Sequence, residues 1–216
     1  MEKINYYNVS LAEIAKFKEL GRRPTLALHA CCAPCSSHTL EFLTTYFDIT
    51  IVYENSNVYP EAEFTKRRDE IEYFIEEFNK RNETNVKIVF LPYDHEGYMA
   101  DLRKFADEPE GGERCRLCYA KHIEDALIYA TENGFDYAST TLTISRQKNS
   151  QVINQVAKEV SKNFSKVKYF YSDFKKKGGL MRVQEMKEEY GLYQQLYCGC
   201  EYSYSAMLKH RKKPRK

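Results

Sequence analysis

Stretches typical of strands and of helices alternate along this chain, and that alternation limits its possible folds more than any other feature. The short apolar run at 26–28 predicts a buried strand, and runs rich in β-branched or aromatic residues predict four more, at 49–53, 86–91, 137–142 and 167–171. Between them apolar residues recur at helical spacing, as at Phe64, Ile71 and Phe78. We therefore expect an α/β fold of Rossmann-like type, with a mainly parallel sheet flanked by helices and functional loops at the carboxyl ends of the strands.

All five predicted strands fit within one domain. The chain has 216 residues, of which 43% are hydrophobic, enough for one sizeable core. It has no internal repeat and no linker long enough to separate two domains. We expect an N-terminal helical extension at 1–24, a catalytic α/β domain at 25–205 and a basic C-terminal tail at 206–216.

The chain offers no apolar run close to the roughly 18 residues needed to cross a bilayer. Its start, MEKINYYNVS, lacks the apolar core of a secretory signal. We expect a cytoplasmic protein.

Seven cysteines fall into three tight groups: Cys31, Cys32 and Cys35; Cys115 and Cys118; Cys198 and Cys200. Structural disulfides are rare in a reducing cytosol, so metal or redox chemistry is the better explanation for this clustering. Buried cysteines that act only as small hydrophobic residues would account for one or two of them. The first group follows a predicted strand, which places a metal site at the carboxyl ends of the strands.

Four thiolates converging from separate segments suit either zinc or an iron–sulfur cluster. Zinc ribbons usually use two C-x-x-C knuckles, whereas Cys31 and Cys32 are directly adjacent, and this favours iron–sulfur. Cys35 remains open as a fifth ligand, a ligand of a second metal or a spare thiol.

The segment Cys198-Gly199-Cys200 holds two thiols separated by a single glycine. Such a pair can close into a strained disulfide with an oxidising potential, or it can supply two further metal ligands. Neither a GxxxxGK[ST] loop nor a GxGxxG motif occurs, so no phosphate cradle for a nucleotide cofactor is visible. Electrons are then expected from an external donor.

Net charge alone does not call for a nucleic-acid partner, because 33 Lys and Arg face 31 Asp and Glu. Basic residues are nevertheless concentrated at 209–216 and at Lys175, Lys176 and Lys177. Either run could contact phosphates or could simply be solvated.

Five blocks of the sequence, in this order, together resemble the QueH family of epoxyqueuosine reductases. They are HACCAPCSSHTLEFL at 29–43, DEPEGGERCRLCY at 107–119, TTLTIS at 140–145, SDFKKKGG at 172–179 and EYGLYQQLYCGC at 189–200. The resemblance extends from about residue 24 to 204. It implies reduction of epoxyqueuosine to queuosine at the wobble position of tRNAs with a GUN anticodon, the last step of queuosine biosynthesis.

The resemblance also implies roles for the cysteines. Cys31, Cys32, Cys115 and Cys118 would hold a [4Fe–4S] cluster, and Cys198 and Cys200 would form a redox-active pair. Cys35 stands where a ligand of one additional iron ion would be expected. Family members often carry proline where Arg146 stands, which puts the shape of that loop in question.

Several further residues lie in these blocks. The candidate proton donors are Asp173, Tyr119, His29 and His38, each of which also has an ordinary structural interpretation. Thr140, Thr141, Thr143 and Ser145 could bind nucleoside hydroxyls, with Arg146 near a phosphate.

Three other functions compete with the reductase. A cluster-dependent tRNA sulfurtransferase would need ATP, for which no phosphate loop is visible. A zinc module that binds nucleic acid would be colourless and leaves Cys198-Gly199-Cys200 without a role. A simple thiol–disulfide oxidoreductase would use only two of the seven cysteines.

Overall fold

Five strands form one sheet in which every neighbouring pair is parallel. They are β1 (Thr25–His29), β2 (Asp48–Tyr53), β3 (Lys87–Phe90), β4 (Tyr137–Thr140) and β5 (Lys168–Tyr169), in the spatial order β3-β2-β1-β4-β5. The structure is a computed structural model that describes residues 3–211. It confirms the predicted α/β class with a parallel sheet. The strand expected at 137–142 ends at Thr140, because Thr141–Ile144 form a short 3-10 helix, η3.

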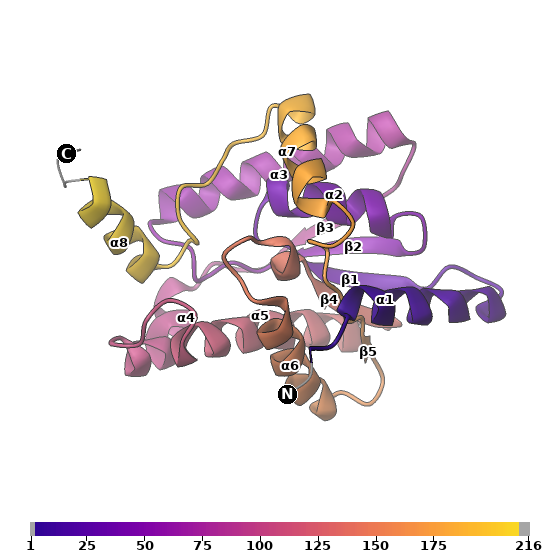
Figure 1. The fold of residues 1–216 in the computed structure, drawn as a ribbon, viewed down its shortest axis with the longest axis horizontal. Helices are drawn as coiled ribbons and strands as arrows, with labels where there is room; N and C mark the ends of the chain where they lie inside the picture. Colours follow the sequence, from indigo (N-terminus) through magenta and orange to yellow (C-terminus); the bar gives the residue numbers. More distant parts are fainter. Residues whose placement is uncertain (1–2, 212–216) are drawn as a thin grey trace.

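Helices cover both faces of the sheet (Figure 1). In chain order they are α1 (Tyr6–Ala15), α2 (Ala33–Leu43), α3 (Glu61–Asn82), α4 (His95–Leu102), α5 (Glu113–Glu132), α6 (Ser150–Val160), α7 (Gly179–Tyr190) and α8 (Glu201–Arg211). Helices α2, α3 and α7 lie on one face, and α5 and α6 on the other.

Successive side chains of β1 point to opposite faces of the sheet and so divide the core into two layers. Leu26 and Leu28 point into the layer under α2, α3 and α7, whereas Ala27 points into the layer under α5 and α6. All three side chains are fully buried, and both of their layers are rich in aliphatic and aromatic residues. A strand buried on both faces reads as a continuous apolar run, which is why Leu26-Ala27-Leu28 predicted it.

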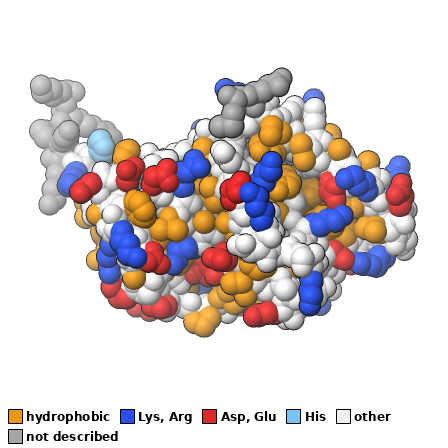
Figure 2. All heavy atoms as spheres, turned by 90° about the horizontal axis from the view of Figure 1, so that it is seen from below, with side chains coloured by type: hydrophobic (Ala, Val, Ile, Leu, Met, Phe, Trp, Pro, Cys, Tyr) orange, Lys and Arg blue, Asp and Glu red, His pale blue; other side chains and the backbone are white. Residues whose placement is uncertain are grey.

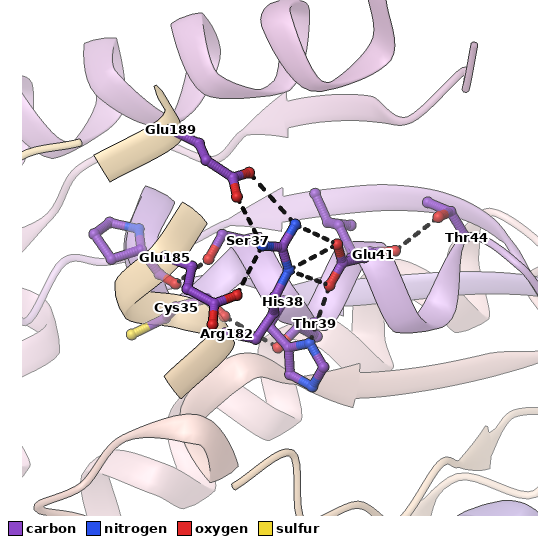
Figure 3. Close-up of polar contacts among 11 residues, drawn as sticks. Cys35, Ser37, His38, Thr39, Glu41, Thr44, Arg182, Glu185 and Glu189 are labelled. Carbon is purple, nitrogen blue, oxygen red and sulfur yellow. Dashed lines mark hydrogen bonds and ion pairs between the residues drawn. The ribbon is translucent and has the colours of Figure 1, made fainter. Parts of the chain in front are cut away.

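Helix α7 is held against α2 by one arginine. Figure 3 shows Arg182 between Glu41 of α2 and two glutamates of its own helix, Glu185 and Glu189. Its Nη2 donates to Glu41 Oε1 at 2.8 Å and its Nη1 to Glu189 Oε1 at 2.8 Å. The docking fixes the first helix after the Cys31 group against the segment that leads to Cys198.

Both chain ends carry helical structure. Residues 6–15 form α1 and Lys16–Leu20 a 3-10 helix, η1, within the expected N-terminal extension. Residues 206–211 of the expected basic tail are the second half of α8, and the rest of that tail lies outside the described residues.

Charge on the described surface is mixed. Figure 2 shows Lys and Arg side chains interspersed with Asp, Glu and hydrophobic side chains on one face of the molecule. No helix within residues 3–211 has the length and apolar character to cross a membrane.

Candidate functional site

The chain connections change direction between β1 and β4. From β1 they lead outward through β2 to β3, and then return to β4 on the other side of β1. Ligands of open parallel sheets bind outside the carboxyl ends of the strands at such a switch point. Cys31 follows β1 and Thr141 follows β4, and their Sγ and Oγ1 atoms lie 3.9 Å apart. The first cysteine group therefore stands at the position where this fold most often builds a site.

Cys31, Cys32 and Cys35 converge at the start of α2. Their sulfur atoms all lie within 4.8 Å of one another, and the Cys31 and Cys32 sulfurs are 3.8 Å apart. Pro34 stands in the first turn of α2, where its missing amide hydrogen costs nothing and its fixed φ favours the helix. Three converging thiols can hold a soft metal ion.

The three thiols carry charge unequally. Hydrogen bonds with Cys32 and Cys35 hold the pKa of Cys31 well below its ordinary value. The same contacts with Cys31 raise the pKa of Cys32 and of Cys35. One thiolate is thus shared by two protonated neighbours, and a metal ion bound here would displace their protons.

Cys115 and Cys118 lie in the first two turns of α5. The Cys115 sulfur accepts a hydrogen bond from the Gly111 amide at 3.2 Å. Tyr98 donates its hydroxyl hydrogen to the Cys118 carbonyl at 3.0 Å. Burial raises the pKa of the Cys118 thiol, but the charge and hydrogen bond of His122 and the hydrogen bond from Tyr98 together outweigh burial and lower the pKa.

Behind Cys118 lies a buried group that the sequence did not single out. His122 donates from Nδ1 to Glu54 Oε2 at 3.1 Å, and its ring stacks on that of His29 at 4.3 Å. Burial raises the pKa of Glu54, but the hydrogen bond and charge of His122 and the hydrogen bonds from Ser56 together outweigh burial and bring the pKa to about 2. His122 stands three residues after Tyr119 and four before Ala126, both buried, and this spacing was the available signal.

Cys198 and Cys200 are held beside the first group by Arg67, another residue that the sequence analysis did not identify. Arg67 is 2% exposed and donates to the carbonyls of Cys198 at 3.2 Å and Tyr197 at 3.3 Å. Its Nε donates to Glu63 Oε1 at 2.8 Å. Arg67 falls between Phe64 and Ile71 on the apolar stripe of α3, a position that predicts burial.

All seven cysteines, each a free thiol, line two adjoining cavities. The larger cavity, of about 330 Å³, is lined by Cys31, Cys32, Cys35 and Cys198. The smaller, of about 30 Å³, is lined by Cys31, Cys115, Cys118, Cys198 and Cys200. Three residues border both cavities: Cys31, Lys148 and Cys198. Three segments distant in sequence thus place their thiols around one connected space.

The candidate proton donors occupy different places. His29 is fully buried, its Nε2 donates to the Glu54 carbonyl at 3.1 Å and its Nδ1 lies 2.8 Å from Thr140 Oγ1. Burial and the charge of His122 lower the pKa of His29 to about 3, so the ring is neutral. Its two contacts give it a structural role. Tyr119 borders the smaller cavity.

Neither His38 nor Asp173 borders the two cysteine cavities. His38 Nδ1 lies 3.4 Å from Glu41 Oε2. Asp173 Oδ2 accepts from the Ser150 hydroxyl at 2.9 Å. These contacts support their structural interpretations.

The residues considered for nucleoside contact also divide. Thr143 is buried and lies 3.0 Å from Ser172, oxygen to oxygen, and neither Thr140 nor Thr141 borders the two cavities. Ser145 and Arg146 line the larger cavity, and Arg146 is exposed.

The three lysines considered for phosphate contact differ in their exposure. Lys175 is partly buried and donates to two backbone carbonyls, of Ser145 and Lys148. Lys176 and Lys177 are exposed. Only the latter two have surfaces open to an external phosphate.

Comparison with known proteins gives one consistent family. A family model described as "Epoxyqueuosine reductase QueH" matches residues 26–206. A protein of that name from Streptococcus pyogenes is 42% identical over 202 residues, covering 94% of this chain and 79% of its own length. Its namesake from Staphylococcus aureus is 41% identical over 204 residues, which cover 94% of this chain and 85% of that protein. The namesake from Thermotoga maritima is 29% identical over 195 residues, which cover 88% of this chain and 93% of that protein.

Proposed function

The chain belongs to the epoxyqueuosine reductase QueH family, and on that premise we propose that it reduces the epoxide of epoxyqueuosine to the cyclopentene of queuosine at the wobble position of tRNA. This is the last step of queuosine biosynthesis, and a tRNA substrate agrees with the expected cytoplasmic location. The observation that carries the proposal is the meeting of all seven cysteines around two adjoining cavities at the carboxyl edge of the sheet.

We assign a [4Fe–4S] cluster to Cys31, Cys32, Cys115 and Cys118. The donor set fits, since Cys31, Cys115 and Cys118 line the smaller cavity and the Cys32 sulfur is 3.8 Å from that of Cys31. Thiolates are the usual ligands of such clusters, and the cluster when bound supplies electrons to the reaction. Cys35, within 4.8 Å of Cys31 and Cys32, is assigned to one additional iron ion.

Cys198 and Cys200 are assigned as the redox-active pair. Cys198 borders both cavities, so its thiol can exchange electrons with a group bound in either one. Oxidation of two thiols to a disulfide releases two electrons and two protons, and an external electron donor would restore the thiols. Conversion of an epoxide to an alkene consumes two electrons and two protons and releases water, so the two half-reactions balance.

The larger cavity is assigned to the modified nucleoside. It combines apolar walls at Ile144 and Leu180 with polar groups such as Gln147, which is the usual composition of a small-molecule site. Arg146 and Lys187 also line it, and Arg146 is exposed, so they can contact the phosphates that flank the wobble position of a GUN anticodon.

The first test is spectroscopic. Protein purified without oxygen is expected to be brown, to bleach with dithionite, and to contain about four irons or slightly more with matching sulfide. A Cys118→Ser variant should lose cluster iron, whereas Cys200→Ser should keep it but lose turnover of epoxyqueuosine-containing tRNA. A colourless zinc protein after anaerobic reconstitution would contradict the proposal and favour the nucleic-acid-binding zinc module.

A further inference from the structure

Resting on the proposed reduction, we infer that Lys148 is a catalytic residue whose ammonium group binds the epoxide oxygen of the substrate as the carbon–oxygen bond breaks. It borders both cysteine cavities, together with Cys31 and Cys198. A cation at that junction is adjacent both to the space assigned to the nucleoside and to the thiols.

The other basic residues around the two cavities either donate to acceptors within the protein or border only one of the two cavities. The donors of Arg67 are taken by Glu63 and by the Tyr197 and Cys198 carbonyls. Arg114 donates from Nη1 to three backbone carbonyls of the loop before α5 and borders only the smaller cavity. Arg146 and Lys187 border only the larger one.

The Lys148 ammonium group, in contrast, is free for a ligand. Among residues 3–211 it donates no hydrogen bond and forms no ion pair. Its three hydrogens therefore remain available to an oxygen atom that enters the cavity.

The backbone that carries Lys148 is fixed on both sides. Its amide donates to the Ser145 carbonyl at 3.3 Å, and its carbonyl accepts from Lys175 Nζ at 2.7 Å. The next residue, Asn149, caps α6 by accepting from the Gln151 amide at 2.9 Å. This turn fixes the point beside the two cavities at which the Lys148 side chain leaves the backbone.

At neutral pH a lysine side chain ordinarily ends in an ammonium group, which donates three hydrogen bonds and accepts none.

The chemistry requires such a donor. Two electrons from the enzyme's reductant enter the substrate, a carbon–oxygen bond breaks at each of the two epoxide carbons, and the carbon–carbon double bond forms. The departing oxygen takes two protons, which solvent ultimately supplies, and leaves as water. Negative charge develops on that oxygen before the protons arrive, and a fixed cation at hydrogen-bond distance stabilises it.

The test compares Lys148→Met and Lys148→Arg with the control Lys158→Met, which changes an exposed lysine of α6 that borders neither cysteine cavity. Single-turnover reduction of epoxyqueuosine-containing tRNA, without oxygen, should slow about 10²- to 10³-fold in Lys148→Met, the usual effect of removing one such donor. Lys148→Arg keeps a cation and should be slowed less. Iron and sulfide content should match wild type in all three variants.

Equilibrium binding supplies a readout independent of turnover. Without reductant, wild type should bind epoxyqueuosine-containing tRNA more tightly than the same tRNA with queuosine, because only the former offers the oxygen. Lys148→Met should bind both equally, and Lys158→Met should keep the preference.

Three results would overturn the inference: a wild-type rate in Lys148→Met, a retained preference for the epoxide, or a loss of iron in step with activity. Failure of the proposed function would look different, because wild type itself would neither reduce nor prefer the epoxide-containing tRNA.

Discussion

Arg67 shows how a single buried charge organises the site. Its guanidinium lies inside the protein, with Glu63 as its only acidic partner among the described residues and the carbonyls of Cys198 and Tyr197 as its other acceptors. A buried cation is tolerated when its donors are satisfied, and each satisfied donor then fixes the group that accepts it. The position of the Cys198 segment is thus determined from α3.

Replacement of Arg67 by methionine should release that segment. We expect a loss of about 3 kcal/mol in unfolding free energy, because Glu63, whose side chain is only 11% exposed, loses the cation that it pairs with. Alkylation of Cys198 and Cys200 should become about tenfold faster or more, since two hydrogen bonds of about 1 kcal/mol each are lost. Mass spectrometry of the alkylated peptides measures this, with the partly exposed Arg68→Met as the control; equal alkylation rates in the two variants would contradict the role.

Gly199 is the second residue on which the segment depends. Its φ of 135° lies in a region that other residues rarely adopt, and a Cβ there would lie 3.1 Å from Arg67 Nη1 and 3.2 Å from Val58 Cγ2. The glycine between the two cysteines is therefore required by both backbone and packing.

Gly199→Ala should destabilise the protein by about 1–3 kcal/mol, the usual cost of forcing such a conformation. Urea unfolding followed by circular dichroism measures the loss. Gly21→Ala is the matched control, since Gly21 has φ 64° with no atom within 4 Å of its Cβ position and so reports the backbone cost alone. A smaller loss in Gly199→Ala than in the control would contradict the packing argument.

The two ends of the strands have different roles. The site lies beyond their carboxyl ends, and a group of polar contacts joins two of the strands at their amino ends. Asp136, just before β4, accepts from Arg22 Nη2 at 2.6 Å and from the Thr25 amide at 2.9 Å. These contacts join the starts of β1 and β4, the two strands whose far ends carry Cys31 and Thr141. The register of that pair, Leu26 opposite Tyr137, is thereby fixed at its origin.

The stabilisation that Asp136 gives to this junction should depend on pH. The hydrogen bond from Arg22, then that from the Thr25 amide, hold the pKa of Asp136 well below its usual range. A carboxyl group with a depressed folded-state pKa contributes its full stabilisation above the unfolded value of about 3.9 and loses it as pH falls toward the folded value.

Asp136→Asn is accordingly expected to lower the unfolding free energy by about 1–2 kcal/mol at pH 7, the size of a partly exposed charge-assisted hydrogen bond. The difference from wild type should shrink progressively below about pH 4. Urea unfolding at pH 7 and pH 3 measures it, with the exposed Asp69→Asn as control. A difference that stays constant with pH would count against the assignment.

The sequence predicted the elements better than it predicted the contacts between them. Strands such as β1 were visible because burial on both faces demands a continuous apolar run. Lys148 was not visible, since nothing in its local pattern differs from a surface lysine and its importance arises from the distant segments that bear Cys31 and Cys198. The contacts of Lys175 were not visible either, because its acceptors are backbone carbonyls that any sequence would offer.

For the whole molecule, the hydrophobic core and the cysteine cavities are largely separate. The two core layers lie between the sheet and its helices, whereas the thiols lie beyond the strand ends. The fold should therefore survive without metal, in contrast to small zinc domains that unfold when the metal is removed.

Removal of iron with a chelator under reducing conditions is expected to leave the far-ultraviolet circular dichroism unchanged. Hydrogen exchange should quicken only around residues 31–35, 111–119 and 197–203, because local opening there no longer breaks metal–thiolate bonds. Mass spectrometry of peptides from loaded and stripped protein makes the comparison. Global loss of protection in β1 and β2 would show instead that the core itself depends on the metal.

The placement of the three cysteine groups along the chain has a consequence for how the protein is made. Synthesis proceeds from the N-terminus, and N-terminal parts generally fold first. The groups at Cys31 and Cys115 are therefore complete while the segment that bears Cys198 and Cys200, the wall shared by both cavities, is still to be added. Access for an incoming metal is widest before the segment with Cys198 and Cys200 has been synthesised, and that later segment closes the site that the earlier groups began.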